Sequence, residues 1–109
     1  MRKQTLLRVL VLGLGIAMAG PALSAGDPHA GRLKAFTCFG CHGIPGYTNA
    51  YPNYHVPKLG GQHAQYIVKA LTEYKEHKRS YPTMQAQAAS LSKQDMEDIA
   101  AFFQGFKNN

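Results

Sequence analysis

Two cysteines and the histidine that follows them are the residues of this 109-residue chain whose spacing most clearly indicates chemistry. They form the run Cys38-Phe39-Gly40-Cys41-His42, which contains the only two cysteines of the sequence. Cysteines three positions apart lie on one face of a helical turn, so both sulfurs can bond to the two vinyl groups of one porphyrin. The histidine can then give an imidazole nitrogen to the iron. The sequence therefore predicts one c-type haem, held covalently by Cys38 and Cys41 and ligated by His42.

Two other kinds of site share the Cys-x-x-Cys spacing. A thiol oxidoreductase would carry it beside a strand-helix-strand unit, and this sequence contains no alternating apolar strands. A zinc site needs a second Cys or His pair at ligand spacing, whereas His55, His63 and His77 are eight and fourteen residues apart. Both alternatives are less favoured than the haem.

The first twenty-five residues have the pattern of a secretory signal peptide. A positive start is followed by an uninterrupted small-apolar run over residues 9–19 and by small residues at 22–25. The run is too short for the roughly 30 Å hydrocarbon core of a bilayer, so an uncleaved anchor is the less favoured alternative. We expect cleavage near Ala25, export to the periplasm, and one haem domain over residues 26–109.

Charge and length limit the possible partners and the possible core. The whole chain has a formal net charge of +6, and removal of residues 1–25 takes away three basic and no acidic residues, which leaves +3. Two haem propionates would bring this close to neutral, so nothing indicates a nucleic-acid partner. A domain this short buries little apolar surface unaided, so the haem is expected to supply much of the core.

Two stretches before the C-terminal region are predicted to be helical. The first begins at Pro28 after the capping residue Asp27, runs into the cysteine motif, and presents Ala30, Leu33 and Phe36 on one side. The second covers residues 62–76, with an apolar stripe at i, i+3, i+4 and i+7 formed by Ala64, Ile67, Val68 and Leu71. Residues 75–79 form a solvated, mostly basic end.

The C-terminal helix has the clearest pattern. Ser92 and Asp95 form a capping box, and Gly105 is placed to end the helix. Its apolar stripe consists of Met96, Ile99, Ala100 and Phe103. Between the predicted helices, residues 43–61 are expected to form a long loop that wraps something, and residues 80–84 a second extended loop.

The sixth ligand of the iron has five candidates, namely His55, His63, His77, Met84 and Met96. Met84 is favoured because it follows a proline in a predicted loop, where a side chain can be aimed at the haem. Met96 lies on the apolar stripe of the last helix and is expected to pack in the core. The three histidines lie in loop or surface contexts.

Four segments carry further motifs. They are Cys38-Phe39-Gly40-Cys41-His42-Gly43, Pro57-Lys58-Leu59-Gly60-Gly61-Gln62, Met84 with the Ala-rich segment after it, and Leu91-Ser92 before a helix that ends in Phe102-Phe103. With these segments, nearly all of residues 26–109 resembles a class I (monohaem) cytochrome c, and most of all one domain of the dihaem cytochromes c of bacterial respiratory chains.

The resemblance implies a fold and a set of site residues. The fold would be small and all-α, with three to four helices around one covalently attached haem and the first helix packed across the last. Met84 would be the sixth ligand, and the carbonyl of Pro57 would accept a hydrogen bond from the second nitrogen of His42, which fixes its tautomer. One departure from the family is the longer, tyrosine-rich segment 44–56, which is interpreted either as cover for one haem edge or as a docking surface.

The expected function is electron transfer without catalysis. The protein would be a monomeric or weakly dimeric periplasmic carrier that moves single electrons between a redox donor and a redox acceptor. It could also make peripheral contact with membrane respiratory complexes. The main alternative is a permanent haem subunit of a dehydrogenase or oxidase. A haem peroxidase or gas-binding protein with an open sixth site is a weaker alternative.

Overall fold

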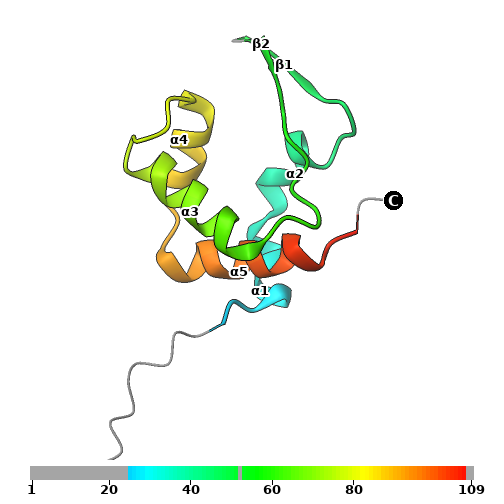
Figure 1. Cartoon of the computed structure of the whole chain (residues 1–109), viewed down its shortest axis with the longest axis vertical. Helices are drawn as coiled ribbons and strands as arrows, with labels where there is room; N and C mark the ends of the chain where they lie inside the picture. Colours follow the sequence, from blue (N-terminus) through cyan, green and yellow to red (C-terminus); the bar gives the residue numbers. More distant parts are fainter. Residues whose placement is uncertain (1–24, 52, 108–109) are drawn as a thin grey trace, which may run out of the picture.

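Helices account for most of the residues that the structure describes. The computed structural model describes residues 25–51 and 53–107. Its helices are α1 (Pro28–Lys34), α2 (Phe36–His42), α3 (Ala64–Lys75), α4 (Pro82–Ala89) and α5 (Lys93–Gly105), shown in Figure 1. The all-α prediction is confirmed, with five helical segments in place of three to four. The predicted signal peptide lies outside the described residues except for Ala25, and no helix in the described part is long and apolar enough to cross a membrane.

The first predicted helix is divided at Ala35, which caps α1 and precedes α2. The α1 segment crosses α5 at Gly31, where an added Cβ would lie 1.9 Å from the carbonyl oxygen of Asp98. Only glycine allows the two backbones to approach this closely. The side that was predicted to carry Leu33 and Phe36 faces solvent, and these side chains are 80% and 81% exposed.

A buried carboxylate fastens α1 to α5. Asp98 is 3% exposed and accepts hydrogen bonds from the backbone N–H of Asp27 at 2.8 Å, Lys34 Nζ at 2.6 Å and Gln94 Nε2 at 2.8 Å. The ammonium group of Lys34 is the main reason that the pKa of Asp98 falls to about 2. The carboxylate is therefore charged and fully paired where the first helix meets the last.

The apolar stripes of α3 and α5 form the core as predicted. Ile67 and Leu71 of α3 are buried, together with the α5 side chains Met96, Ile99, Ala100 and Phe103. The predicted capping box is present: Ser92 Oγ accepts from the backbone N–H of Asp95, and the Asp95 carboxylate accepts from the backbone N–H of Ser92. Met96 is 3% exposed, which confirms its assignment to the core.

The predicted loop over residues 43–61 contains a short antiparallel hairpin. Its strands are β1 (Thr48–Ala50) and β2 (Asn53–His55), with Asn49 opposite Tyr54. In Figure 1 the hairpin extends beyond α2, away from α1 and α5. Strands of three mostly polar residues are too short to give a readable period of two, so the sequence did not reveal them.

The predicted loop over residues 80–84 is wrong at its second half. Pro82 begins α4, so Met84 lies in the first turn of a helix. Proline is favourable at the start of a helix, and the alanines that follow have high helix propensity. The side chain of Met84 is therefore directed by a helix that packs against α3, and not by an extended loop.

Candidate functional site

The hairpin, the loop that follows it and residues of α2, α3, α4 and α5 line a cavity of about 410 Å³. This volume lies in the range of small-molecule and cofactor sites. Its apolar wall includes Val56, Leu59, Ile67, Leu71 and Ile99. The Cys-x-x-Cys-His motif and Met84 border the same space, although they are separated by more than forty residues in sequence.

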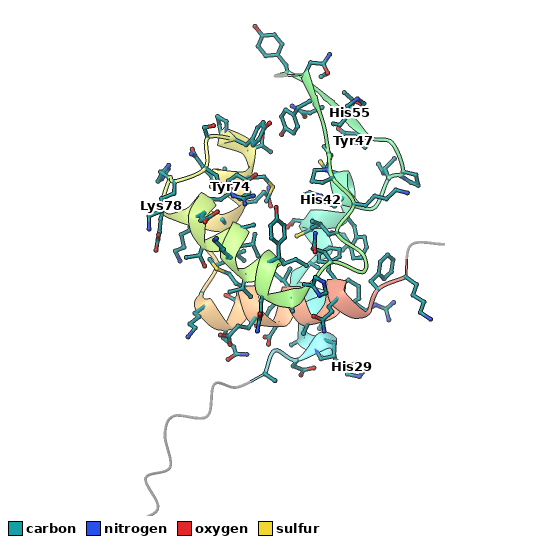
Figure 2. All side chains as sticks on the ribbon, in the orientation of Figure 1. His29, His42, Tyr47, His55, Tyr74 and Lys78 are labelled. Carbon is teal, nitrogen blue, oxygen red and sulfur yellow. The ribbon has the colours of Figure 1, made fainter. Side chains whose placement is uncertain are left out.

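His42 is the last residue of α2 and is held by the loop that follows the hairpin. Its Nδ1 lies 2.7 Å from the carbonyl oxygen of Pro57. A carbonyl oxygen only accepts, so Nδ1 donates and Nε2 keeps its lone pair. Burial lowers the pKa of His42 below its ordinary value, although the hydrogen bond to Pro57 acts in the opposite direction. The side chain is therefore a neutral imidazole with one nitrogen available to a metal, and Figure 2 shows it at the base of the hairpin.

The two cysteines are half-buried and border the cavity on the α2 side. Neither forms a disulfide. Burial raises the pKa of the Cys38 thiol, so this sulfur is protonated at neutral pH before it forms any covalent bond. An imidazole nitrogen, two thiols and an apolar chamber in one place fit a covalently bound porphyrin.

The candidates for the sixth ligand are separated by the fold. Met84 and His55 border the cavity, whereas His63, His77 and Met96 are absent from its lining. His77 is exposed just after α3 and has a positive φ of 58°. Nδ1 of His55 lies 3.1 Å from Thr48 Oγ1. The structure therefore brings together His42, Pro57, Cys38, Cys41 and Met84.

A second group of cavity residues was missed by the sequence analysis. Arg79, which was placed in a solvated basic segment, borders the cavity with its guanidinium carbon 5.7 Å from the Tyr66 ring centre and 5.5 Å from that of Tyr74. Its Nε donates to Glu73 at 2.7 Å, and its pKa is raised, chiefly by contact with Tyr66. Tyr66, Ala70 and Tyr74 occur at i, i+4 and i+8 on α3, a stripe that could have indicated a second functional face.

Comparison with known families decides the classification. The sequence profile of the family described as "Cytochrome c" matches residues 30–107. The chain belongs to the cytochrome c family. This family carries covalently attached haem c, so the predicted cofactor and the predicted class I cytochrome c fold are both confirmed. Proteins of this family carry electrons through the iron of their haem.

Similar proteins refine this classification. Cytochrome c4 of Pseudomonas aeruginosa is 44% identical over 98 residues, which cover 90% of this chain and 46% of that protein. Cytochrome c-554(548) of Halomonas halodenitrificans is 39% identical over 82 residues, 72% of this chain and 95% of the relative. The cytochrome subunit of sulfide dehydrogenase from Chlorobaculum tepidum is 27% identical and matches 87% of this chain and 86% of the relative.

The fold also matches a solved structure. The crystal structure of reduced recombinant cytochrome c4 from Pseudomonas stutzeri aligns with a TM-score of 0.57 and 33% identity, over 75% of this chain and 50% of that one. The chain thus spans about half the length of the cytochromes c4 that it matches. It corresponds to one cytochrome c domain, in agreement with the predicted resemblance.

Proposed function

We propose that this domain is a periplasmic electron carrier with a haem attached through Cys38 and Cys41 and ligated by His42 and Met84. One observation carries the proposal. A neutral His42, fixed by the Pro57 carbonyl, and the thioether of Met84 border the same apolar cavity as the two cysteines.

The roles of the chain's own residues follow from this arrangement. When bound, the haem supplies the one-electron chemistry of its iron. Pro57 orients the imidazole of His42 and makes it a better donor. A thioether opposite a histidine favours the reduced iron and raises the reduction potential. If His42 and Met84 both hold the iron, they would leave no place on it for peroxide or other small ligands, as a carrier requires and a peroxidase does not.

The location rests on the sequence pattern of residues 1–25. A signal peptide and a c-type haem motif support each other because covalent haem attachment takes place outside the inner membrane. Partners would be a redox donor and a redox acceptor, with contact at the surface of membrane respiratory complexes. A carrier must release each partner, so its interfaces are expected below about 1,200 Å² and its own state monomeric or weakly dimeric.

Voltammetry of the holoprotein purified from the periplasm tests the proposal. We expect one reversible one-electron wave and no turnover of hydrogen peroxide. Mass spectrometry of the same sample should give residues 26–109 plus one haem, so retained Met1 would contradict the predicted cleavage. Rapid peroxide consumption would contradict the carrier and favour an open sixth site.

A permanent haem subunit of a larger dehydrogenase is the second candidate. It is favoured by the similarity to the cytochrome subunit of sulfide dehydrogenase over most of both chains. Size-exclusion chromatography of the native protein distinguishes the two. A free carrier elutes at the size of a monomer or dimer, whereas a subunit elutes with its enzyme.

A further inference from the structure

An aromatic contact beside the cavity joins the tyrosine-rich hairpin to the helical part of the molecule. Tyr54 of β2 lies with its ring centre 4.8 Å from that of Tyr81, at an interplanar angle of 48°. Both tyrosines border the cavity. No Cα atom of either strand, as far as these are described, lies within 8 Å of a helical Cα atom. Side chains therefore make the connection between hairpin and helices.

The hairpin has an inner and an outer side. Tyr54 and its cross-strand partner Asn49 are half-buried and border the cavity, whereas Thr48, Ala50 and Asn53 are exposed and absent from its lining. His55 is exposed and also borders the cavity. Tyr51 follows β1 and is 97% exposed. Tyr54 thus contacts Tyr81, the residue that precedes α4. Tyr51 lies in the same segment and is exposed, so it provides a control.

Tyr81 is the residue that caps the start of α4. Its carbonyl oxygen accepts the backbone N–H of Gln85 at 3.0 Å, so it closes the helical turn that contains Met84. The chain just before it is held from the other direction, because Gln85 Nε2 donates to the carbonyl of Arg79 at 2.6 Å and Arg79 is paired with Glu73 of α3. The first turn of α4 is therefore fixed by α3 on one side and by Tyr54 on the other.

We propose that Tyr54 is a positioning residue that holds Met84 at the haem site through Tyr81. The proposal rests on the proposed ligation of the iron by Met84. In this arrangement the inner face of the hairpin stabilises Met84 in its position at the site. Tyr54 then serves to cover the cavity and not to dock a partner.

A competing ligand gives a direct measure of this role. Imidazole can bind the oxidised iron only when Met84 has moved away, so its apparent affinity is scaled by the fraction of molecules in that open state. Loss of the Tyr54–Tyr81 contact removes one aromatic pair from the closed state alone. The open fraction, and with it the apparent affinity for imidazole, should then rise about tenfold.

The experiment titrates oxidised holoprotein with imidazole and follows the methionine–iron charge-transfer band. Tyr54→Ala should bind imidazole about tenfold more tightly than wild type. Tyr54→Phe, which keeps the ring, and Tyr51→Ala should both stay within about twofold of wild type. Tyr81→Ala removes the same contact from the α4 side and tests the idea if Tyr54→Ala does not fold. The double variant should bind imidazole no more tightly than either single variant.

Several results would overturn the proposal. Wild-type imidazole affinity in Tyr54→Ala, even with a lowered melting temperature, would reduce Tyr54 to a purely structural role. Additive effects of Tyr54→Ala and Tyr81→Ala would show that the residues do not act through their mutual contact. A wild-type protein without the charge-transfer band would overturn Met84 ligation itself, and this inference with it. If the wild-type protein shows the band but the variants bind imidazole with unchanged affinity, only this inference is overturned.

Discussion

Nδ1 of His42 donates to the carbonyl oxygen of Pro57 over 2.7 Å, which ties the last residue of α2 to the loop after the hairpin. A strong hydrogen bond at this position increases the electron density on the other ring nitrogen. The reduction potential should therefore depend on how firmly the backbone at residue 57 is held.

Replacement of this proline tests that dependence. Pro57→Gly should loosen the backbone, weaken the hydrogen bond and raise the potential by an amount small against the roughly 0.8 V range of axial ligation. Pro57→Ala keeps a restrained carbonyl and should lie closer to wild type. Voltammetry gives the potentials, with Pro45→Gly as a control in the same loop region. Identical potentials for Pro57→Gly and Pro45→Gly would contradict the predicted dependence.

Truncation of Met84 and of Met96 should affect different properties of the protein. Met84→Ala should abolish the charge-transfer band and lower the potential by a substantial part of the range that axial ligands span. Met96 is 3% exposed, so Met96→Ala should leave the potential intact and cost about 2–5 kcal/mol of unfolding free energy. Spectroscopy, voltammetry and urea unfolding separate these outcomes. No methionine–iron band in wild type, together with an unchanged potential in Met84→Ala, would make His55, the other candidate that borders the cavity, the first suspect.

Local patterns predicted the parts of this domain that local physics determines. Ser92 and Asp95 form their capping box, and the stripe that contains Ile99 and Phe103 is buried, because spacing alone sets both features. The haem motif and the class I fold were also predictable. Tertiary packing determined the rest. The family resemblance predicted that the first helix packs across the last, and α1 does pack on α5. The sequence did not reveal that Gly31 makes this contact, so that Leu33 faces solvent.

The positions of the proposed ligands were more predictable than the walls of the cavity. Met84 borders the cavity, as the expected ligand must, but its place in α4 depends on the helix start at Pro82. Arg79 looked solvent-exposed from the sequence. Its partners Tyr66 and Tyr74 lie earlier in the chain, on α3, and only the fold places them around the guanidinium.

The crossing of α1 and α5 should tolerate no side chain at residue 31. In Gly31→Ala the new Cβ would meet the Asp98 carbonyl oxygen at 1.9 Å and Phe102 Cβ at 2.9 Å, so the helices must separate. We expect a loss of about 1–3 kcal/mol or more in unfolding free energy. Gly105→Ala is the matched control, because nothing lies within 4 Å of its Cβ position. Equal stability of the two variants in urea would contradict this crossing geometry.

Acid should weaken the same crossing through Asp98. The Lys34 ammonium lowers the pKa of this carboxyl from 3.8 to about 2 in the folded protein. A depressed acid pKa stabilises the fold above the unfolded value of about 4. This contribution is lost as the pH falls from there towards 2. Thermal unfolding against pH should show the loss in wild type and a smaller one in Asp98→Asn.

Lysine variants on the two helices provide the control for this acid effect. Lys34→Met should flatten the same pH window, because Lys34 Nζ contacts both Asp98 at 2.6 Å and Asp95 at 2.7 Å. Lys93 is 70% exposed and lies 3.8 Å from Glu97, so Lys93→Met should leave the profile nearly unchanged. A profile of Lys34→Met that matches that of Lys93→Met would mean that the buried pair does not control acid stability.

Electron exchange with a partner protein should depend only weakly on ionic strength. Residues 75–79 form a mostly basic segment, but Lys78 Nζ lies 2.5 Å from Glu76 and Arg79 Nε lies 2.7 Å from Glu73. Lys75 donates to the carbonyl oxygen of Leu91. With these charges largely paired, the rate should fall less than about tenfold between 0.01 and 1 M salt, a range over which the Debye length shrinks from about 30 to 3 Å.

Stopped-flow rates for wild type, Lys78→Ala and the control Lys69→Ala should have similar slopes against ionic strength. A slope lost only in Lys78→Ala would identify this basic segment as a docking site. A tight complex insensitive to salt would favour the permanent subunit over the carrier.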